Sequence, residues 1–560
     1  MPEPTGPGSS RRHDLDALRA AAMLLGIAYH AALSFSLGAG WIVQDVDQSK
    51  PLYILQAFVH GFRMQLFMVL SGFFTALLWR RQGLKALLWN RFRRVLLPCL
   101  AALVTLVPAV KWVGSFATKA NTARRLNASQ KVTPEGGLWG AIENQDFHAF
   151  AKHLKMPAAL TTLHPEFHLR ALSWAALVGS PQIVGALLGK GAEVNWRSAK
   201  GHTALHGAAF FGRSEVAELL IQSGADITAL SLSGESPWQS ASTDYSWVEY
   251  IAGYLGVTVQ REQVLEGRRR ILQRLEAHGA LREVPGGVTA RNAWKETFTR
   301  LVHTPAFSLV WFLWFLVWLL LIFSLYAVLA ERFGWRLHPH RLLVSQGSLL
   351  WLVPLTGLST WFMKSAHGEF GPDTSMGILP MPHVLAYYAL FFGFGVLYFE
   401  CGDATGRLGR SWRWTLPVSL LVVFPAALEF ATGTFGLREH LLPTAQHRVA
   451  SVVFQALYAW MMTFAGIGMF RSLLARENEP IRYLSDASYW FYLAHLPLVL
   501  AAQAFVCQWA VPAELKFLLL CFLVGTALFW SYDRFVRYSF IGSFLNGPRL
   551  RVGTRPEPKI

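Results

Sequence analysis

A series of apolar blocks, each about 17 to 25 residues long, limits what this chain can fold into more than any other feature. As a helix, a block of that length crosses the roughly 30 Å hydrocarbon core of a bilayer. Only 15% of the residues are charged, against about 25% in globular proteins, which excludes disordered, fibrous and ordinary cytosolic proteins. We therefore predict an all-α membrane bundle of about ten transmembrane helices, over residues 15–37, 52–79, 95–113, 307–330, 342–362, 383–400, 413–432, 449–470, 488–509 and 515–535.

Basic residues in the connections predict the orientation of this bundle. Six lie between the second and third predicted helices, whereas Lys50 alone lies between the first and second. Cytoplasmic loops carry an excess of Lys and Arg, and an even number of spans returns the chain to the side where it began. We therefore expect both termini in the cytoplasm. Much of the net charge of +17 then belongs to cytoplasmic loops, and no nucleic acid partner is expected.

A polar segment between the third and fourth predicted helices contains an internal repeat. LSWAALVGSPQIVGALLGKGAEVN, from Leu172, aligns with LHGAAFFGRSEVAELLIQSGADIT, from Leu205, at an offset of 33 residues. That period, together with HTALHGAA over residues 202–209, resembles the ankyrin repeat. Weaker copies start at Gly137 and, after an insertion around residues 241–265, at Arg270. We predict four stacked repeats, the outer two acting as caps.

The repeat segment divides the chain into domains. By the parity of the spans, it projects on the outer side of the membrane, and ankyrin surfaces ordinarily bind proteins, so a protein partner is expected there. The predicted boundaries are 1–113 and 301–547 for the two parts of the membrane domain, 114–300 for the ankyrin insertion and 548–560 for a cytoplasmic tail.

Ionisable residues inside predicted spans are candidates for function, because charge is costly in hydrocarbon. Arg19 and His30 are 11 residues apart, which places them on one helical face, about 16 Å apart along the axis. This arrangement suits an anionic cofactor bound from the cytoplasm, whose reactive end reaches a buried acid or base. A snorkelling arginine and a histidine that bridges two helices explain the pattern equally well.

Two further pairs of basic residues lie in and after the second predicted helix. His60 and Arg63 share a helical face near its outer end, where Arg63 either binds an anionic acyl group or a sugar, or anchors the helix at the interface. Arg91 and Arg94 share a face just before the third helix. They suit bidentate contacts to phosphates, although ordinary cytoplasmic charge is the commoner explanation of such a cluster.

The remaining polar residues of the spans are less specific. For His383, Glu429 and His495, helix packing is the commoner explanation, ahead of the orientation of a catalytic histidine. Ser71-Gly72 indicates close helix packing rather than a nucleophile, because no GxSxG motif surrounds it. Neither a metal motif nor a GxxxxGK[ST] loop is present in the sequence, so we expect no metal and no direct use of ATP.

Two motifs at the start of the chain resemble the acyltransferase 3 family of integral membrane acyltransferases. LDALRAAAMLLGIAYH carries the family's pattern of an arginine, ten residues and a histidine, as Arg19 and His30. RFRRVLLP carries its RxxR pattern, as Arg91 and Arg94.

Two other stretches extend the resemblance. FVHGFRMQLFMVLSGFF, which contains His60 and Arg63, is similar to the second helix of a bacterial glucan-biosynthesis branch of the family. DASYWFYLAHLPLVL is similar to a late helix of the family and contains His495. Together the similar regions cover about residues 11–113 and 300–547, which is essentially all of the membrane part.

The resemblance implies a bacterial inner-membrane enzyme that transfers a succinyl or acetyl group from cytoplasmic acyl-CoA to a carbohydrate hydroxyl, on a periplasmic glucan or envelope polysaccharide. Acyl-CoA is then a donor substrate, and no cofactor is expected. His30 becomes a general base or a transient acyl carrier. Arg19, Arg91 and Arg94 hold the donor phosphates. The supporting or substrate-binding residues are His60, Arg63, His383 and His495.

Two other classes of function fit parts of the sequence. A transporter also has many helices and buried charges, but the two halves of this chain show no convincing duplication. An ankyrin receptor needs only an anchor, and one helix is enough for that. Consumption of acyl-CoA, compared with uptake of glucan into proteoliposomes, separates the enzyme from the transporter.

Overall fold

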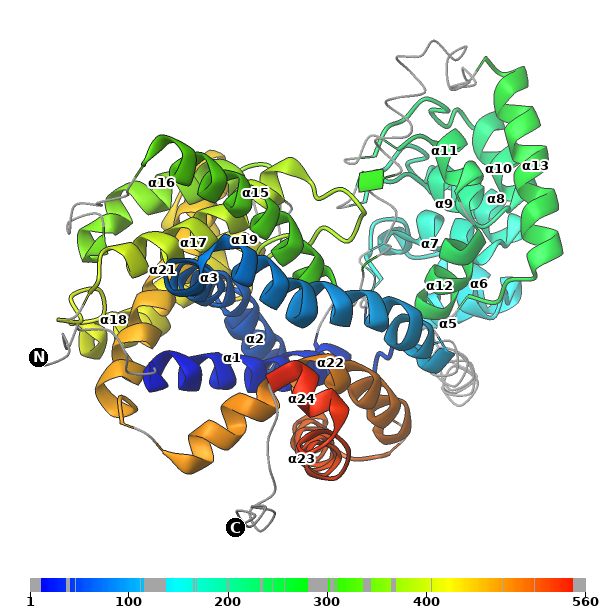
Figure 1. The fold of residues 1–560 in the computed structure, drawn as a ribbon. Helices are drawn as coiled ribbons and strands as arrows, with labels where there is room; N and C mark the ends of the chain where they lie inside the picture. Colours follow the sequence, from blue (N-terminus) through cyan, green and yellow to red (C-terminus); the bar gives the residue numbers. More distant parts are fainter. Residues whose placement is uncertain are drawn as a thin grey trace, which may run out of the picture. The chain divides into compact units, whose positions relative to one another are not determined.

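The chain folds as two compact units of helices. One comprises residues 1–39, 45–113 and 296–560, and the other residues 40–44 and 114–295. A computed structural model (Figure 1) describes residues 12–546, except 37–40, 46, 111, 115–136, 165–166, 168, 199–200, 232–234, 244, 256, 280–300, 303–306, 308–309, 336–343, 364–368, 404, 477 and 508. Within this described part, no β-strand occurs, which confirms the predicted all-α class. The predicted tail at 548–560 lies outside the described residues.

The membrane unit is built largely from long apolar helices. Its helical elements are α1 (His13–Ala32), η1 (Leu33–Phe35), α2 (Lys50–His60), α3 (Arg63–Arg91), η2 (Phe92–Leu96), a helix over 97–110, α15 (Trp311–Phe333), η5 (Gln346–Ser348), α16 (Leu349–Thr360), α17 (Pro382–Glu400), α18 (Trp412–Val418), η7 (Ser419–Val423), α19 (Phe424–Thr432), α20 (Arg438–Leu441), α21 (Thr444–Leu473), α22 (Glu479–Val506), α23 (Ala513–Ser531), η8 (Tyr532–Val536) and α24 (Phe540–Asn546).

Eight segments of the described chain are long and apolar enough to cross a membrane, compared with the ten that we predicted. The predicted helices 52–79 and 95–113 lie within one helical stretch, Lys50–Gly114, which breaks after His60 and again at Gly83, where φ is +80°. The predicted helix 342–362 shrinks to α16, whose 12 residues are fewer than the roughly 20 that a span needs. Apolar composition identifies the segments that avoid water, but it does not show where the backbone turns within such a segment.

Two glycines allow the closest helix crossing of the membrane unit. A Cβ on Gly72 of α3 would lie 1.9 Å from the carbonyl oxygen of Phe392 in α17, and a Cβ on Gly395 of α17 would lie 2.0 Å from the carbonyl oxygen of Val69. Both glycines therefore bring the two backbones into direct contact, as small residues do in membrane proteins. This geometry supports the packing interpretation of Ser71-Gly72.

Helix α1 carries Arg19 and His30, and five other helices pack against it. They are α2, α3, α21, α22 and α23. Its buried face is rich in small and aliphatic residues, including Ala20, Ala22 and Ala31. Small side chains let the neighbouring helices approach α1 closely.

The ankyrin unit is a stack of short helix pairs. Its elements are α5 (Gly137–Glu143), α6 (Phe147–His153), η3 (Pro157–Leu160), α7 (Ala171–Val178), α8 (Pro181–Gly189), α9 (Ala204–Phe210), α10 (Ser214–Gln222), α11 (Pro237–Ser242), α12 (Tyr245–Leu255) and α13 (Arg261–Ala277). Gly191 and Gly224, at equivalent positions of the 33-residue repeat, both adopt positive φ, +84° and +85°. This conformation favours glycine and closes each outer helix with the same turn.

The last helix pair of the stack contains the insertion. Helix α11 packs against α9 and α13, and α13 packs against α10, so α11 and α13 act as inner and outer helices. Helix α12 lies between them in the sequence, within the predicted insertion at 241–265. Together with α5/α6, α7/α8 and α9/α10, this pair completes four helix pairs. Apolar side chains shared by neighbouring pairs form one continuous core, as stacking repeats require.

Candidate active site

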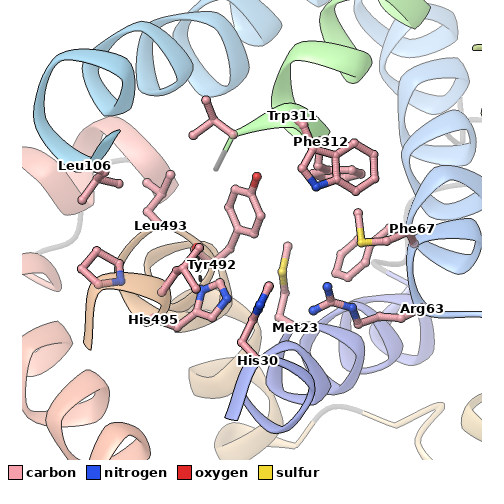
Figure 2. Close-up of a pocket in the computed structure, with 14 residues that line it drawn as sticks. Met23, His30, Arg63, Phe67, Leu106, Trp311, Phe312, Tyr492, Leu493 and His495 are labelled. Carbon is pink, nitrogen blue, oxygen red and sulfur yellow. Dashed lines mark hydrogen bonds between the residues drawn. The ribbon is translucent and has the colours of Figure 1, made fainter. Parts of the chain in front are cut away.

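Three predicted site residues, His30, Arg63 and His495, meet in a pocket of the membrane unit. Figure 2 shows the three side chains in the same space, His30 from α1, Arg63 from α3 and His495 from α22. The remaining lining is largely apolar and aromatic. It comprises Met23, Met64, Phe67, Leu106, Val310, Trp311, Phe312, Tyr492, Leu493, Leu496 and Pro497. An apolar pocket with a few convergent nitrogen groups is the usual form of a small-molecule site.

The rings of His30 and His495 are neighbours. Their centroids are 5.1 Å apart with the planes at 45°, and the ring of Tyr29 packs edge-on against His30 at 4.9 Å. The side chain of Gln503 donates a hydrogen bond to the backbone carbonyl of His30 at 2.8 Å. Helix α22 thus contacts both the ring and the backbone of His30.

His495 is held by the backbone of its own helix. Its Nδ1 lies 2.9 Å from the carbonyl oxygen of Phe491 and 2.8 Å from that of Tyr492. A ring nitrogen between two acceptors must carry the hydrogen, so Nδ1 is the donor and Nε2 keeps its lone pair. Among the residues that the structure describes, Nε2 has no hydrogen-bond partner, although the side chain is buried. Pro497, two residues later, lacks the N–H that would close the helix turn at Leu493.

Arg63 enters the pocket past a glycine of α1. A Cβ on Gly26 would lie 2.1 Å from Nη1 of Arg63, so the guanidinium occupies the space that a side chain at this position would fill. The cation lies over the ring of Tyr29, 5.3 Å from its centroid. No carboxylate in the described chain forms a salt bridge with Arg63. The pocket therefore contains a cation that an anionic ligand can neutralise.

Arg19, Arg91 and Arg94 form a separate cationic cluster. Their charges lie close enough to interact with one another. Arg91 donates a hydrogen bond to Thr75 Oγ1 at 3.1 Å, and Arg19 donates one to Ser485 Oγ at 3.0 Å. None of the three lines the pocket.

One face of α22 connects the cationic cluster with the pocket. Ser485 bonds Arg19, and Tyr489 donates to the backbone carbonyl of Arg94 at 2.5 Å. Tyr492 and His495 follow on the same face and line the pocket.

Helices α1 and α22 run in the same direction along this face. Arg19 meets Ser485 near the start of both helices, and His30 meets His495 further along. The two pairs are about 15 Å apart along the axes. A cluster of cations and a pair of histidines therefore lie at the two ends of one helix interface.

His60 belongs to the surroundings of the pocket rather than to its lining. His60 ends α2 and Arg63 begins α3, so the premise that both share one face of a single helix was wrong. The ring of His60 instead stacks on Tyr29, with centroids 5.4 Å apart. Gly371, at φ +95°, leaves room for that ring, because a Cβ there would lie 2.0 Å from it. His60 and Arg63 thus hold Tyr29 from two helices.

His383 and Glu429 lie away from the pocket. His383 sits at the first turn of α17 and does not line it. Glu429 accepts hydrogen bonds from the backbone N–H groups of Phe435, Leu437 and Arg438, and so closes the turn after α19. For Glu429 this geometry supports the packing interpretation. His495 was the residue that the sequence undervalued, because nothing local in the sequence shows that its side chain lines a pocket.

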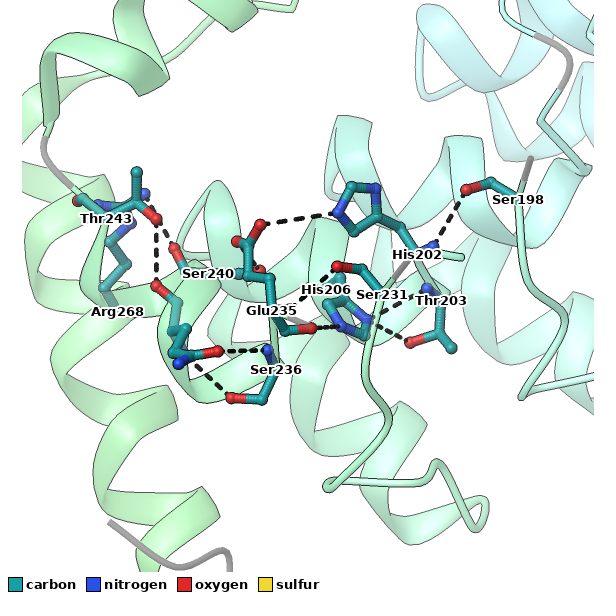
Figure 3. Close-up of polar contacts among 11 residues, drawn as sticks. Ser198, His202, Thr203, His206, Ser231, Glu235, Ser236, Ser240, Thr243 and Arg268 are labelled. Carbon is teal, nitrogen blue, oxygen red and sulfur yellow. Dashed lines mark hydrogen bonds and ion pairs between the residues drawn. The ribbon is translucent and has the colours of Figure 1, made fainter. Parts of the chain in front are cut away.

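The ankyrin unit contains a polar network around the HTALHGAA motif (Figure 3). His206 Nδ1 accepts a hydrogen bond from the Thr203 N–H, and Nε2 lies 2.9 Å from the carbonyl oxygen of Glu235. Burial lowers the pKa of His206, which keeps the ring neutral. His202 Nε2 lies 3.8 Å from Glu235 Oε2 and lowers the pKa of the Glu235 carboxyl. These contacts tie successive repeats together and form a structural network.

Comparisons with known proteins match both units. A family model described as an acyltransferase domain, that of the acyltransferase 3 group, matches residues 12–122 and 237–533. A second model, described as ankyrin repeats in three copies, matches residues 138–231. The second part of the acyltransferase match begins at residue 237, so it includes α11 to α13. In the fold, these three helices belong to the ankyrin unit.

Curated relatives match a shorter region. Proteins named glucans biosynthesis protein C from three Escherichia coli strains, SMS-3-5, K12 and O1:K1, are each 40% identical to this chain over 95 residues. That region is 17% of this chain and 24% of each relative, so the chain spans about a quarter of the length of the curated relatives that it matches.

Proposed function

This chain is a multi-pass membrane acyltransferase of the acyltransferase 3 family, and on that premise we propose that it moves an acyl group from cytoplasmic acyl-CoA to a carbohydrate hydroxyl. The observation that carries the proposal is the interface of α1 and α22, with three arginines at one end and two histidines at the other. Acyl-CoA has the matching form, with phosphates at one end and a thioester at the other.

The donor lies along this interface. Arg19, Arg91 and Arg94 bind its phosphates, since guanidinium groups form strong charge-assisted bonds to phosphate. The thioester reaches His30 in the apolar pocket. There His30 acts as a general base on the acceptor hydroxyl or takes the acyl group as a nucleophile. The aromatic lining excludes water, which protects the thioester from hydrolysis.

Arg63 sets the acyl group or the acceptor in place. It is a pocket cation without a carboxylate partner in the described chain, so it suits the free carboxylate of a succinyl group. An acetyl group has no free carboxylate, so with an acetyl donor Arg63 would contact the acceptor sugar instead. The name of the E. coli relatives, glucans biosynthesis protein C, supports a glucan as the acceptor. The proposed transfer takes place on the periplasmic side of a bacterial inner membrane. The ankyrin unit then faces the periplasm and binds a protein partner or positions the acceptor.

Removal of one arginine of the cationic cluster tests the donor site. Arg91→Ala is expected to raise the KM for acyl-CoA about 10- to 100-fold, because a hydrogen bond to a charged group contributes about 1.5–3 kcal/mol. The change in kcat should be smaller. Steady-state release of CoA by the purified protein in nanodiscs measures both constants.

A truncated donor separates binding from folding. The acyl thioester of N-acetylcysteamine has the reactive group of acyl-CoA but no phosphates, so Arg91→Ala should use it as well as the unaltered protein does. Arg81→Ala removes the same charge from an exposed position and should keep the unaltered KM for acyl-CoA. An equal loss with both donors would assign Arg91 to the fold instead.

The side of the ankyrin unit is tested by labelling single cysteines in intact cells with an impermeant thiol reagent. Lys190→Cys, on an exposed position of the ankyrin unit, is expected to react before lysis. Gln82 is exposed and lies between the predicted helices 52–79 and 95–113, in the loop predicted to be cytoplasmic. Gln82→Cys is therefore expected to react only after lysis. The parent chain has four cysteines of its own, and labelling of the parent chain measures the background from them. Reaction of Lys190→Cys only after lysis would contradict the periplasmic placement.

A further inference from the structure

One ring nitrogen of His495 is hydrogen-bonded to the backbone, and the other has no hydrogen-bond partner among the described residues. Its Nδ1–H points at two backbone carbonyls, at 2.9 and 2.8 Å, so the ring cannot rotate or change tautomer without losing both contacts. Its Nε2 carries a lone pair, is enclosed by protein and accepts no hydrogen bond from any described residue. A buried polar atom without a partner is uncommon and requires an explanation. A fixed imidazole with its lone pair in a substrate pocket is a base that awaits a proton.

The second observation is the position of that base. His495 lines the same pocket as His30, and the two rings are in contact, with centroids 5.1 Å apart. His30 lies on α1 in line with Arg19, so it meets the thioester of a donor that is held by the cationic cluster. His495 is on the facing helix. The pocket therefore contains one histidine on the donor's path and a second beside it.

On the basis of the function proposed above, we propose that the two histidines divide the reaction: His30 carries the acyl group, and His495 Nε2 accepts the proton of the acceptor hydroxyl. This makes His495 a catalytic residue of the second half of the reaction. The chemistry needs no metal or redox group, because only acyl and proton transfers occur.

The steps balance as two displacements. In the first, a His30 ring nitrogen attacks the thioester carbon, the C–N bond forms, the C–S bond breaks, and the His30 ring proton leaves with the thiolate as free CoA. In the second, the acceptor oxygen attacks the acyl carbon, the C–O bond forms and the C–N bond breaks. The hydroxyl proton goes to His495 Nε2, and from there to the His30 nitrogen that received the electron pair. Contact between the two rings allows this last transfer.

Single-turnover kinetics of the full chain in nanodiscs test the division. Without acceptor, the unaltered protein should release about one CoA per chain from succinyl-CoA or acetyl-CoA in a burst, and a glucan oligosaccharide should then discharge the acyl group. His495→Ala and His495→Gln should keep the burst amplitude within about threefold, but slow the discharge about 10²- to 10⁴-fold. Gln fills the space without a basic nitrogen, so it should not restore the rate, whereas added imidazole should accelerate His495→Ala.

The controls distinguish this inference from the proposed function. His440→Ala removes an exposed histidine on α20 and should match the unaltered protein in both phases. Discharge at the unaltered rate by both His495 variants, or full rescue by Gln, would refute the role of His495 while leaving the acyltransferase intact. If the unaltered protein consumed neither acyl-CoA, the function itself would fail instead.

Discussion

Replacement of His30 by alanine is expected to abolish acyl transfer while the protein still inserts and folds. In the proposed reaction, His30 meets the donor thioester in the apolar pocket that it lines together with residues of α22. Loss of a group that acts as a base or nucleophile reduces the rate about 10²- to 10⁴-fold. The measurement is transfer of a radiolabelled acyl group from acyl-CoA to a glucan oligosaccharide in proteoliposomes.

A second histidine of the same helix provides the control. His13→Ala, at the first residue of α1, should transfer at the unaltered rate. Thermal unfolding in detergent should show that all three proteins are folded at the assay temperature, although His30→Ala loses the ring contacts to Tyr29 and His495. Near-normal transfer by His30→Ala would refute its place in the reaction.

Gly72→Val is expected to prevent folding of the membrane unit. The new side chain would meet the carbonyl oxygen of Phe392, which even a lone Cβ would approach to 1.9 Å, and backbone cannot move aside as a flexible side chain can. Overpacking commonly costs about 1–3 kcal/mol, and a clash with backbone lies at or above the upper end of that range. The measurement is the monodisperse yield and the unfolding midpoint after solubilisation.

Variants of two residues near Gly72, Gly395 and Ser71, serve as comparisons in this test. Gly395→Val should cause the same loss, because a Cβ there would lie 2.0 Å from the Val69 carbonyl oxygen. Ser71→Ala changes the adjacent residue without adding volume, and should retain both fold and transfer. A well-folded Gly72→Val protein would show that α3 and α17 are separated by more than the structure indicates, whereas an inactive, folded Ser71→Ala protein would reopen a chemical role for that hydroxyl.

The sequence predicted helices better than it predicted where they end. The length of each apolar block reports a hydrocarbon environment, and this identified nearly every long helix. It did not identify the break after His60 or the short α16, because a turn inside an apolar block leaves the average hydropathy unchanged. The ankyrin unit was easier, since its 33-residue period repeats both the core positions and the turn glycines.

The candidate site divides in the same way. Arg19 and His30 could be placed on one helical face from their spacing alone, because both belong to one helix. The residues that contact Arg19 and His30 could not be predicted from the sequence. Arg19 bonds Ser485, which is 466 residues later in the chain, and His30 contacts His495 at a similar separation. For His495 the sequence favoured packing, since nothing local distinguishes a bridging histidine from one whose Nε2 faces a pocket.

The sequence by itself determined that this protein is a helical membrane protein with an ankyrin insertion, because block length, repeat period and helical spacing are local properties of the chain. Only the tertiary structure decided that α1 and α22 lie side by side in the same direction, that Gly72 and Gly395 bring two backbones into contact, and that Arg63 and two histidines share one pocket. Those features depend on which helices pack together, and packing between distant segments is set by the fit of whole surfaces rather than by any one motif.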